Sequence, residues 1–289
     1  MENQVQRSET RGQCCSCCYP CAKLFQNSRF SLLHEPVNDF FKSQWQKGEC
    51  SKIFLIYRWC FAAWFAVTMG LSLEQFFFEG KWFIYFTNWG FLLCTLVSIY
   101  SAILVSIYCF TAPKAPCPLW MVKLYWALHI SAFACATGLS FIYWILIYPF
   151  AKCQIPEGIH RNEILKIYRR FYVGPDSNTC ITFFHNINSH AITSIMMILD
   201  QIVVVFPTRV SHLIYPVFVV MLYILFSIVY FLMGGENVIG RPYIYRLLNW
   251  GGHPFYSSCV AFGGILFLYP MCLFGYFIYK IRVCLSSSK

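Results

Sequence analysis

Charged residues are scarce in this chain of 289 residues, since only 12% are Asp, Glu, Lys or Arg, whereas 58% are apolar and 20% are aromatic. A soluble domain usually carries roughly 25% charged residues. So few polar groups do not cover the surface of a soluble protein of this length, and the excess apolar surface must face something other than water. The composition therefore predicts an integral membrane protein.

Signatures of several other protein classes are missing. Lys and Arg outnumber Asp and Glu by 22 to 12, but they lie between apolar runs rather than in one basic cluster, so nucleic acid is not an expected partner. No paired CxxC motifs with downstream histidines indicate zinc, and no glycine-rich loop resembles a phosphate-binding motif, so we expect no metal and no cofactor. No secretory signal peptide precedes the first apolar run, so we expect the first spanning helix to direct insertion.

Six apolar runs are each long enough to cross a hydrocarbon core of ~30 Å as a helix. They lie at about 53–73, 82–110, 124–150, 181–206, 213–233 and 256–279. Runs of this length without strict alternation favour helices over the strands of a barrel. We therefore predict an all-α polytopic membrane protein with about six spans, in which residues 1–50 form a Cys-rich tail, 51–280 the transmembrane domain and 281–289 a C-terminal tail.

Basic residues indicate the orientation of the spans. With six spans both termini share one side of the bilayer, and that side carries more of the Lys and Arg residues than the other. The positive-inside rule then favours cytoplasmic termini, in the plasma membrane or an endomembrane. The basic loop at about 151–181 opposes this assignment.

The N-terminal tail contains a dense group of cysteines. They are Cys14, Cys15, Cys17, Cys18 and Cys21. S-acylation is the favoured interpretation, because several thioester-linked chains anchor a segment stably to a membrane. A metal clip and unmodified thiols are the alternatives, although adjacent cysteines do not easily bind one ion.

A second pair of cysteines, Cys153 and Cys180, flanks the loop predicted to lie outside. An oxidising compartment would permit a disulfide between them. Two free thiols near the bilayer are the alternative.

Polar residues within predicted spans are costly in lipid, so each is a candidate for function. They are Thr87 and Asn88 in the second run, His129 in the third, and His185, Asn186, Asn188, His190 and Asp200 in the fourth. With the N-terminus inside, the second and fourth helices both run inward from the outer face. Thr87 is then about five residues into its helix and His190 about nine, so we expect the two side chains at overlapping depths in one leaflet.

A hydroxyl beside an imidazole can act as a nucleophile with its general base. We therefore take Thr87 and His190 as candidate catalytic residues. Asn88, Asn186 or Asn188 would donate to an oxyanion or orient the imidazole.

Two other interpretations of these residues remain open. Threonine in membrane helices commonly bonds its own backbone, and histidine and asparagine often hold helices together, which would make a structural network. An ion, metal or proton path would instead use His185, His190 and Asp200. The spacing is poor for a shared ion, because Asp200 lies about 15 Å beyond His190 along a helix axis.

Three segments carry a resemblance to a known family: DFFKSQWQ at 39–46, FIYFTNWGFLL at 83–93 and NINSHAITSIMMILD at 186–200. Over about residues 30–280 the chain resembles the rolling-stone family of multi-pass membrane proteins. That family is distantly similar to the androgen-induced gene 1 family, which includes intramembrane threonine hydrolases of fatty acid esters of hydroxy fatty acids.

The resemblance implies a lipid-ester hydrolase with Thr87 as the catalytic threonine and His190 as the catalytic histidine, working among membrane lipids. The Cys-rich tail and the loop at 151–181 depart from the hydrolase pattern, which leaves the substrate open. Rolling-stone proteins are associated with myoblast fusion, so a non-catalytic role in cell fusion or adhesion is the alternative. A transporter or channel is a third, which the lack of repeated polar spans disfavours.

Overall fold

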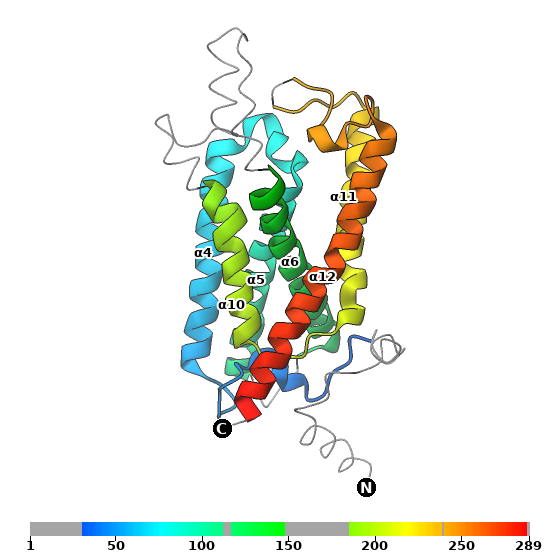
Figure 1. Cartoon of the computed structure of the whole chain (residues 1–289). Helices are drawn as coiled ribbons and strands as arrows, with labels where there is room; N and C mark the ends of the chain where they lie inside the picture. The colour runs from blue at the N-terminus through cyan, green and yellow to red at the C-terminus, as the bar shows by residue number, and fades with distance from the viewer. Residues whose placement is uncertain (1–30, 112–116, 148–184, 239, 288–289) are drawn as a thin grey trace.

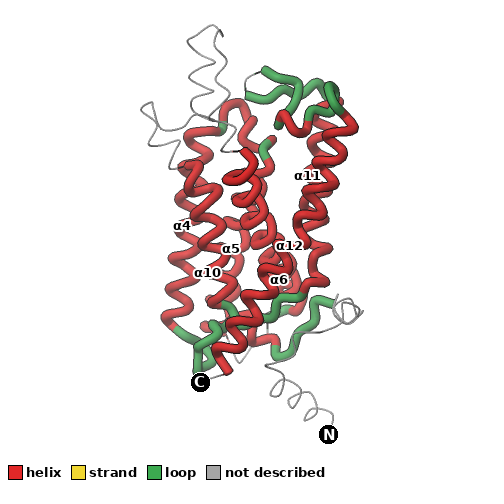
Figure 2. Tube along the Cα trace, in the orientation of Figure 1, coloured by secondary structure: helices red, strands yellow, loops and turns green. Residues whose placement is uncertain are grey.

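The computed structural model of the chain describes residues 31–111, 117–147, 185–238 and 240–287 (Figure 1). These residues form helices and loops and contain no β-strand (Figure 2), which confirms the predicted all-α class. Five of the helices are long and apolar enough to cross a membrane. The prediction of about six spans is consistent with this number, because the fourth predicted run forms a further, shorter helix.

The long helices follow five of the six predicted runs. They are α4 (Lys52–Phe76), α5 (Phe86–Thr111), α6 (Leu119–Ile142), α11 (Ile214–Leu232) and α12 (Pro254–Ser287). Helix α10 (Thr193–Val203) packs with α5, α6 and α12 and is joined to α4 by hydrogen bonds to Asp200, whereas α11 packs with α6 and α12 (Figure 1).

Two short π-helical turns lie beside each other at one end of the bundle. The turn η3 (Tyr143–Ile147) continues α6, and the turn η4 (Ile187–Ile192) precedes α10. The Thr193 hydroxyl donates to the carbonyl oxygen of Asn188, five residues earlier, at 2.7 Å, in keeping with the wider π turn. Such turns occur frequently at functional sites.

The second spanning helix begins later than predicted. Residues from 82 were expected to be part of it, but they belong to a 3-10 segment, η2 (Phe78–Ile84). This segment bends at Glu79 and Gly80, which have positive φ angles of 49° and 76°, and glycine adopts such angles readily. Because α5 starts at Phe86, Thr87 lies in its first turn rather than about five residues into it.

Described residues just outside the predicted transmembrane domain also belong to the helical structure. The segment before α4 contains a 3-10 turn, η1 (Val37–Phe41), which buries Phe40 and Phe41 in the core between the helices. Helix α12 continues through most of 281–289 and ends only at Ser287.

Helix α11 shows most clearly that the outer surface suits lipid. Phe218, Met221, Leu225 and Leu232 are each more than half exposed along one side of the helix. A continuous apolar surface of this kind does not occur on a soluble monomer and fits the hydrocarbon core of a bilayer.

A buried polar network joins α4, α6 and α10. The guanidinium group of Arg58 lies 2.6 Å from Asp200 Oδ1, the Tyr57 hydroxyl donates to the same oxygen at 3.0 Å, and His129 Nε2 lies 2.9 Å from Asp200 Oδ2. Arg58 also donates to the Tyr125 hydroxyl at 3.2 Å. Charges within a membrane domain are expensive unless they are paired, and these groups pair with one another.

A second buried arginine ties α12 to the end of α10. Arg282 is 1% exposed and donates to the carbonyl oxygens of Gln201 at 2.6 Å, Val205 at 3.1 Å and Phe206. The last carbonyl groups of a helix have no partner within the helix, and a cationic donor satisfies them well.

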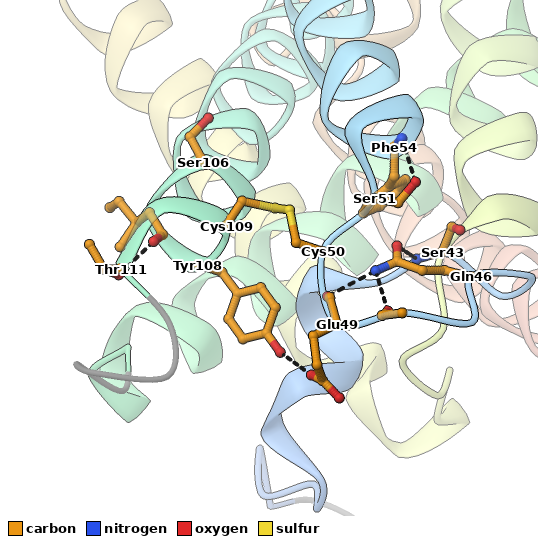
Figure 3. The surroundings of a disulfide bond; sticks show 12 residues. Ser43, Gln46, Glu49, Cys50, Ser51, Phe54, Ser106, Tyr108, Cys109 and Thr111 are labelled. Carbon is orange, nitrogen blue, oxygen red and sulfur yellow. Dashed lines mark hydrogen bonds between the residues drawn. A yellow bond between two sulfur atoms is a disulfide. The ribbon is translucent and has the colours of Figure 1, made fainter.

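A disulfide between Cys50 and Cys109 joins the start of α4 to the end of α5, with Cα atoms 5.3 Å apart (Figure 3). Beside it, Glu49 accepts a hydrogen bond from the Tyr108 hydroxyl at 2.6 Å and lies 2.8 Å from the Lys42 ammonium. Lys42 and Tyr108 lower the pKa of the Glu49 carboxyl below its ordinary value by stabilising the charged form.

The sequence pattern did not indicate this disulfide. The pair it did indicate, Cys153 and Cys180, lies outside the described residues, as does the group of five cysteines near the N-terminus. Disulfides persist in oxidising compartments and are rare in the cytosol. The bond between Cys50 and Cys109 therefore opposes the cytoplasmic placement that the basic residues favour for this end of the bundle.

Candidate functional site

A cavity of about 170 Å³ lies near the end of the bundle at which α5 begins. Parts of α5, α6, α11 and α12, both π turns and the loop before α12 contribute to its walls. Most of the wall is apolar, and its polar groups come from Thr87, Tyr143, His190, Tyr223 and Tyr245. An apolar cavity with a few convergent polar groups is the usual form of a small-molecule site. We call it the Thr87 cavity.

Thr87 reaches the cavity from the first turn of α5. The first amide groups of a helix have no acceptor within it, and the helix dipole places partial positive charge there. The Thr87 hydroxyl is therefore in surroundings that favour a developing negative charge.

His190 reaches the same cavity from the π turn η4. Its ring stacks face to face on the ring of Tyr143, with centroids 3.6 Å apart and an angle of 2° between the planes. Its Nδ1 atom is buried and has no hydrogen-bond partner among the described residues. Aromatic stacking, rather than a carboxylate, thus holds the imidazole in place.

Tyr245 extends from the loop before α12 toward the start of α5. Its side chain lines the Thr87 cavity together with those of Thr87 and Tyr223. Burial raises the pKa of the Tyr245 phenol, and nearby polar groups of Thr87, Phe86 and Tyr223 act in the opposite direction. The Tyr223 hydroxyl donates to the carbonyl oxygen of Ile84 at 2.9 Å, so its own proton is already engaged.

The structure thus brings the two candidate catalytic residues, Thr87 and His190, to one cavity from helices far apart in the sequence. No hydrogen bond links the two side chains within the described part of the chain. Catalytic hydrogen bonds are often long without substrate and shorten when substrate binds.

The asparagines proposed to assist do not line the cavity. The Asn88 amide nitrogen donates to the carbonyl oxygen of Trp82 at 2.7 Å, which fixes the turn before α5. Asn188 is 2% exposed, and its amide oxygen has no hydrogen-bond partner among the described residues. Tyr245, which lines the cavity with Thr87, is instead a candidate donor to an oxyanion.

The proposed ion or proton path is not assembled. Asp200 pairs with Arg58 and His129, and none of these three residues lines the Thr87 cavity. His185 packs against the ring of Phe76 instead, with centroids 4.3 Å apart. Within the described ranges no group of three or more His, Cys, Asp or Glu side chains is placed to hold a metal ion.

Sequence patterns missed the tyrosines of the site and the arginine of the buried network. Tyr245 lies in an irregular loop, where no periodicity shows which way a side chain points. Arg58 had a usable signal, because an arginine within an apolar run requires an acidic partner, and Asp200 is the one acidic residue within the six predicted runs.

Comparison with known proteins gives a consistent result. A family model described as Protein rolling stone matches residues 14–287. The chain is 31% identical to Protein rolling stone of Drosophila melanogaster over 276 residues, which covers 90% of this chain and 89% of the relative. No solved structure matches the chain. The resemblance seen in the three sequence segments is thereby confirmed, and the chain belongs to the rolling stone family of membrane proteins.

Proposed function

We propose that this protein is an intramembrane lipid-ester hydrolase in which Thr87 is the nucleophile and His190 the general base. The observation that carries the proposal is that both side chains line one apolar cavity. The distant resemblance of the sequence to intramembrane threonine hydrolases favours the same assignment.

In the proposed reaction the Thr87 hydroxyl oxygen attacks the carbonyl carbon of the ester while His190 takes its proton. The tetrahedral intermediate collapses, the bond to the alcohol oxygen breaks, and His190 returns the proton to the leaving alcohol. Water then attacks the acyl-threonine ester, and His190 transfers the proton of that water to Thr87. The net products are a carboxylic acid and an alcohol, and no cofactor takes part.

Tyr245 and the start of α5 supply the stabilisation of the oxyanion in this mechanism. Tyr245 lines the same cavity as Thr87. A carbonyl oxygen beside Thr87 would therefore meet a phenol donor and the positive end of the α5 dipole. A preorganised donor of this kind typically contributes about 10²–10³ in kcat.

The walls of the cavity favour a substrate with an acyl chain. Val220 and Ile224 of α11 and Phe267 and Leu268 of α12 contribute to the lining, and both helices also expose large apolar side chains on their outer surfaces. A lipid ester would reach Thr87 laterally from the bilayer without crossing water. An ester of a fatty acid with a hydroxy fatty acid has the required chemistry.

Purified protein in nanodiscs, assayed with such an ester, tests the proposal. Thr87→Ala and His190→Ala should each lower the hydrolysis rate by at least ~100-fold, the range expected for loss of a nucleophile or base. Thr87→Ser should retain measurable activity. Thr95→Ala is the matched control, because Thr95 lies in the same helix, donates to its own backbone at Phe91 and does not line the cavity.

A fluorophosphonate probe gives an independent measurement on the same variants. Labelling that depends on Thr87 but not on Thr95 would support the nucleophile. Labelling and hydrolysis unchanged in Thr87→Ala would exclude it.

A second candidate function is a non-catalytic role in cell fusion or adhesion, favoured by membership of the rolling stone family. It predicts that Thr87→Ala and His190→Ala retain function in a cell-fusion assay once the variants reach the surface.

Under either function we further propose that the five N-terminal cysteines are S-acylated. Labelling of the tail that is lost on treatment with hydroxylamine tests this proposal.

A further inference from the structure

A separate cavity of about 420 Å³ is lined by the first turns of α6. Helix α6 begins at the opposite end of the bundle from the start of α5 (Figure 1). The cavity is bounded by residues 32–40, the first turns of α6 and Arg209. Its walls mix apolar side chains, such as Leu119 and Val122, with the charged side chains of Lys123 and Arg209. We call it the Lys123 groove.

Basic groups predominate in the Lys123 groove. Lys123 forms no ion pair with another described residue, whereas His34, on the wall, already pairs with Asp39 at 2.7 Å. Glu35 is the acidic side chain on the wall, against the two basic side chains of Lys123 and Arg209.

Arg209 is held in a fixed position in the Lys123 groove. Its guanidinium group donates to the carbonyl oxygens of Ser31 at 2.8 Å and Leu33 at 3.0 Å and lies 4.9 Å from the ring centroid of Trp126. These carbonyl groups and this ring orient the guanidinium group. A preorganised cation costs less to bring to an anion than a mobile one does.

The outer edge of the Lys123 groove is suited to the level of the lipid headgroups. Leu119, on its wall, is 51% exposed, and the adjacent Trp120 is 64% exposed. Tryptophan is enriched at the boundary between the hydrocarbon core and the headgroups. The groove therefore offers cations next to an apolar surface, which matches a molecule with a charged head and an acyl chain.

We propose that the Lys123 groove binds the phosphodiester headgroup of an anionic phospholipid, with the acyl chains running along the outer face of α6. Lys123 supplies the mobile cation and Arg209 the fixed one. A free phosphate ion would use the same cations but not the apolar surface formed by Leu119 and Val122. The site is independent of the proposed hydrolase chemistry at the other end of the bundle.

Native mass spectrometry of the full chain in detergent, titrated with phosphatidylglycerol or phosphatidylcholine, tests this proposal. We expect one phosphatidylglycerol to bind more tightly than phosphatidylcholine, and Lys123→Gln to weaken it about fivefold, the factor expected for one basic residue at an anionic lipid surface. Lys123→Arg keeps the charge and should keep the affinity. Lys280→Gln is the matched control, because Lys280 is an exposed lysine near the end of α12.

Three outcomes would overturn the proposal. Equal weakening by Lys123→Gln and Lys280→Gln would mean a diffuse electrostatic attraction. Equal binding of the two lipids would mean that the site does not select the anionic headgroup. Displacement of phosphatidylglycerol by ~10 mM inorganic phosphate would mean a site for the free ion. Equal unfolding temperatures of the variants in the same detergent exclude misfolding as the cause of any loss.

Discussion

Asp200→Asn is expected to destabilise the helix bundle by about 3 kcal/mol, because it removes the charge that compensates Arg58. Arg58 and Asp200 are both 1% exposed, and their side chains lie 2.6 Å apart. Breaking a buried ion pair by removing one partner costs about 3–5 kcal/mol in soluble proteins. Polar pairs within membranes contribute less, about 0.6 kcal/mol on average, because the unfolded chain finds other partners. The expected value is therefore at the lower end of the first range.

The free energy of unfolding, measured by denaturant titration in mixed micelles, tests this expectation. The double variant Arg58→Met, Asp200→Leu leaves no uncompensated charge, so we expect it to be more stable than Asp200→Asn alone. Glu74→Gln is the control, because Glu74 is an exposed carboxylate of α4 and its loss should change stability by no more than about 0.5 kcal/mol.

Two results would refute this reasoning about the buried network. A change below about 0.5 kcal/mol for Asp200→Asn would mean that the ion pair contributes nothing to stability. A double variant as unstable as the sum of the two single variants would mean that Arg58 and Asp200 are not coupled.

Three further predictions concern the cavity, the end of α12 and the disulfide. Gly264 lines the Thr87 cavity, so Gly264→Leu should place a side chain in it and lower the rate of hydrolysis of long-chain esters. Gly263→Leu is the control and should lower that rate less, because Gly263 has open space around it but does not line the cavity. Equal effects of the two substitutions would mean that the substrate binds elsewhere. Arg282→Met should destabilise the bundle by about 2 kcal/mol in the same titration, because three carbonyl oxygens lose a charged donor; an unchanged stability would contradict this. Cys50 and Cys109 should resist maleimide labelling in cells until a reductant is added, and free thiols before reduction would contradict the bond and support a cytoplasmic location.

The end of a helix can be predicted from sequence where a local residue, such as a proline, marks it. Pro118 directly precedes α6, and a proline at such a position is a local signal. The start of α5 had no such signal. The bend at Glu79 and Gly80 lies in the gap between the first two predicted runs, but the apolar residues after it stay in the 3-10 segment η2 as far as Ile84, so hydropathy did not locate the first residue of α5. For this reason Thr87 was placed in the correct helix but too far from its start.

The candidate site was predictable only where a local feature of the sequence marked its residues. Thr87 and His190 stood out because polar residues are rare in apolar runs, and helix direction alone indicated that they enter from one face. Tyr143, Tyr223 and Tyr245 did not stand out, because 19 tyrosines occur in the chain and nothing local distinguishes these three. Their role depends on distant segments that meet at one cavity.

The sequence by itself determined that this is an all-helical membrane protein and where its spans lie. A run of some 20 apolar residues is a local property, and the cost of exposing backbone groups to lipid makes it a helix whatever its neighbours are. Only the tertiary structure decided which residues meet. Arg58 and Asp200 are 142 positions apart and Cys50 and Cys109 are 59 positions apart, and these pairings depend on the packing of helices against each other, which no local pattern encodes.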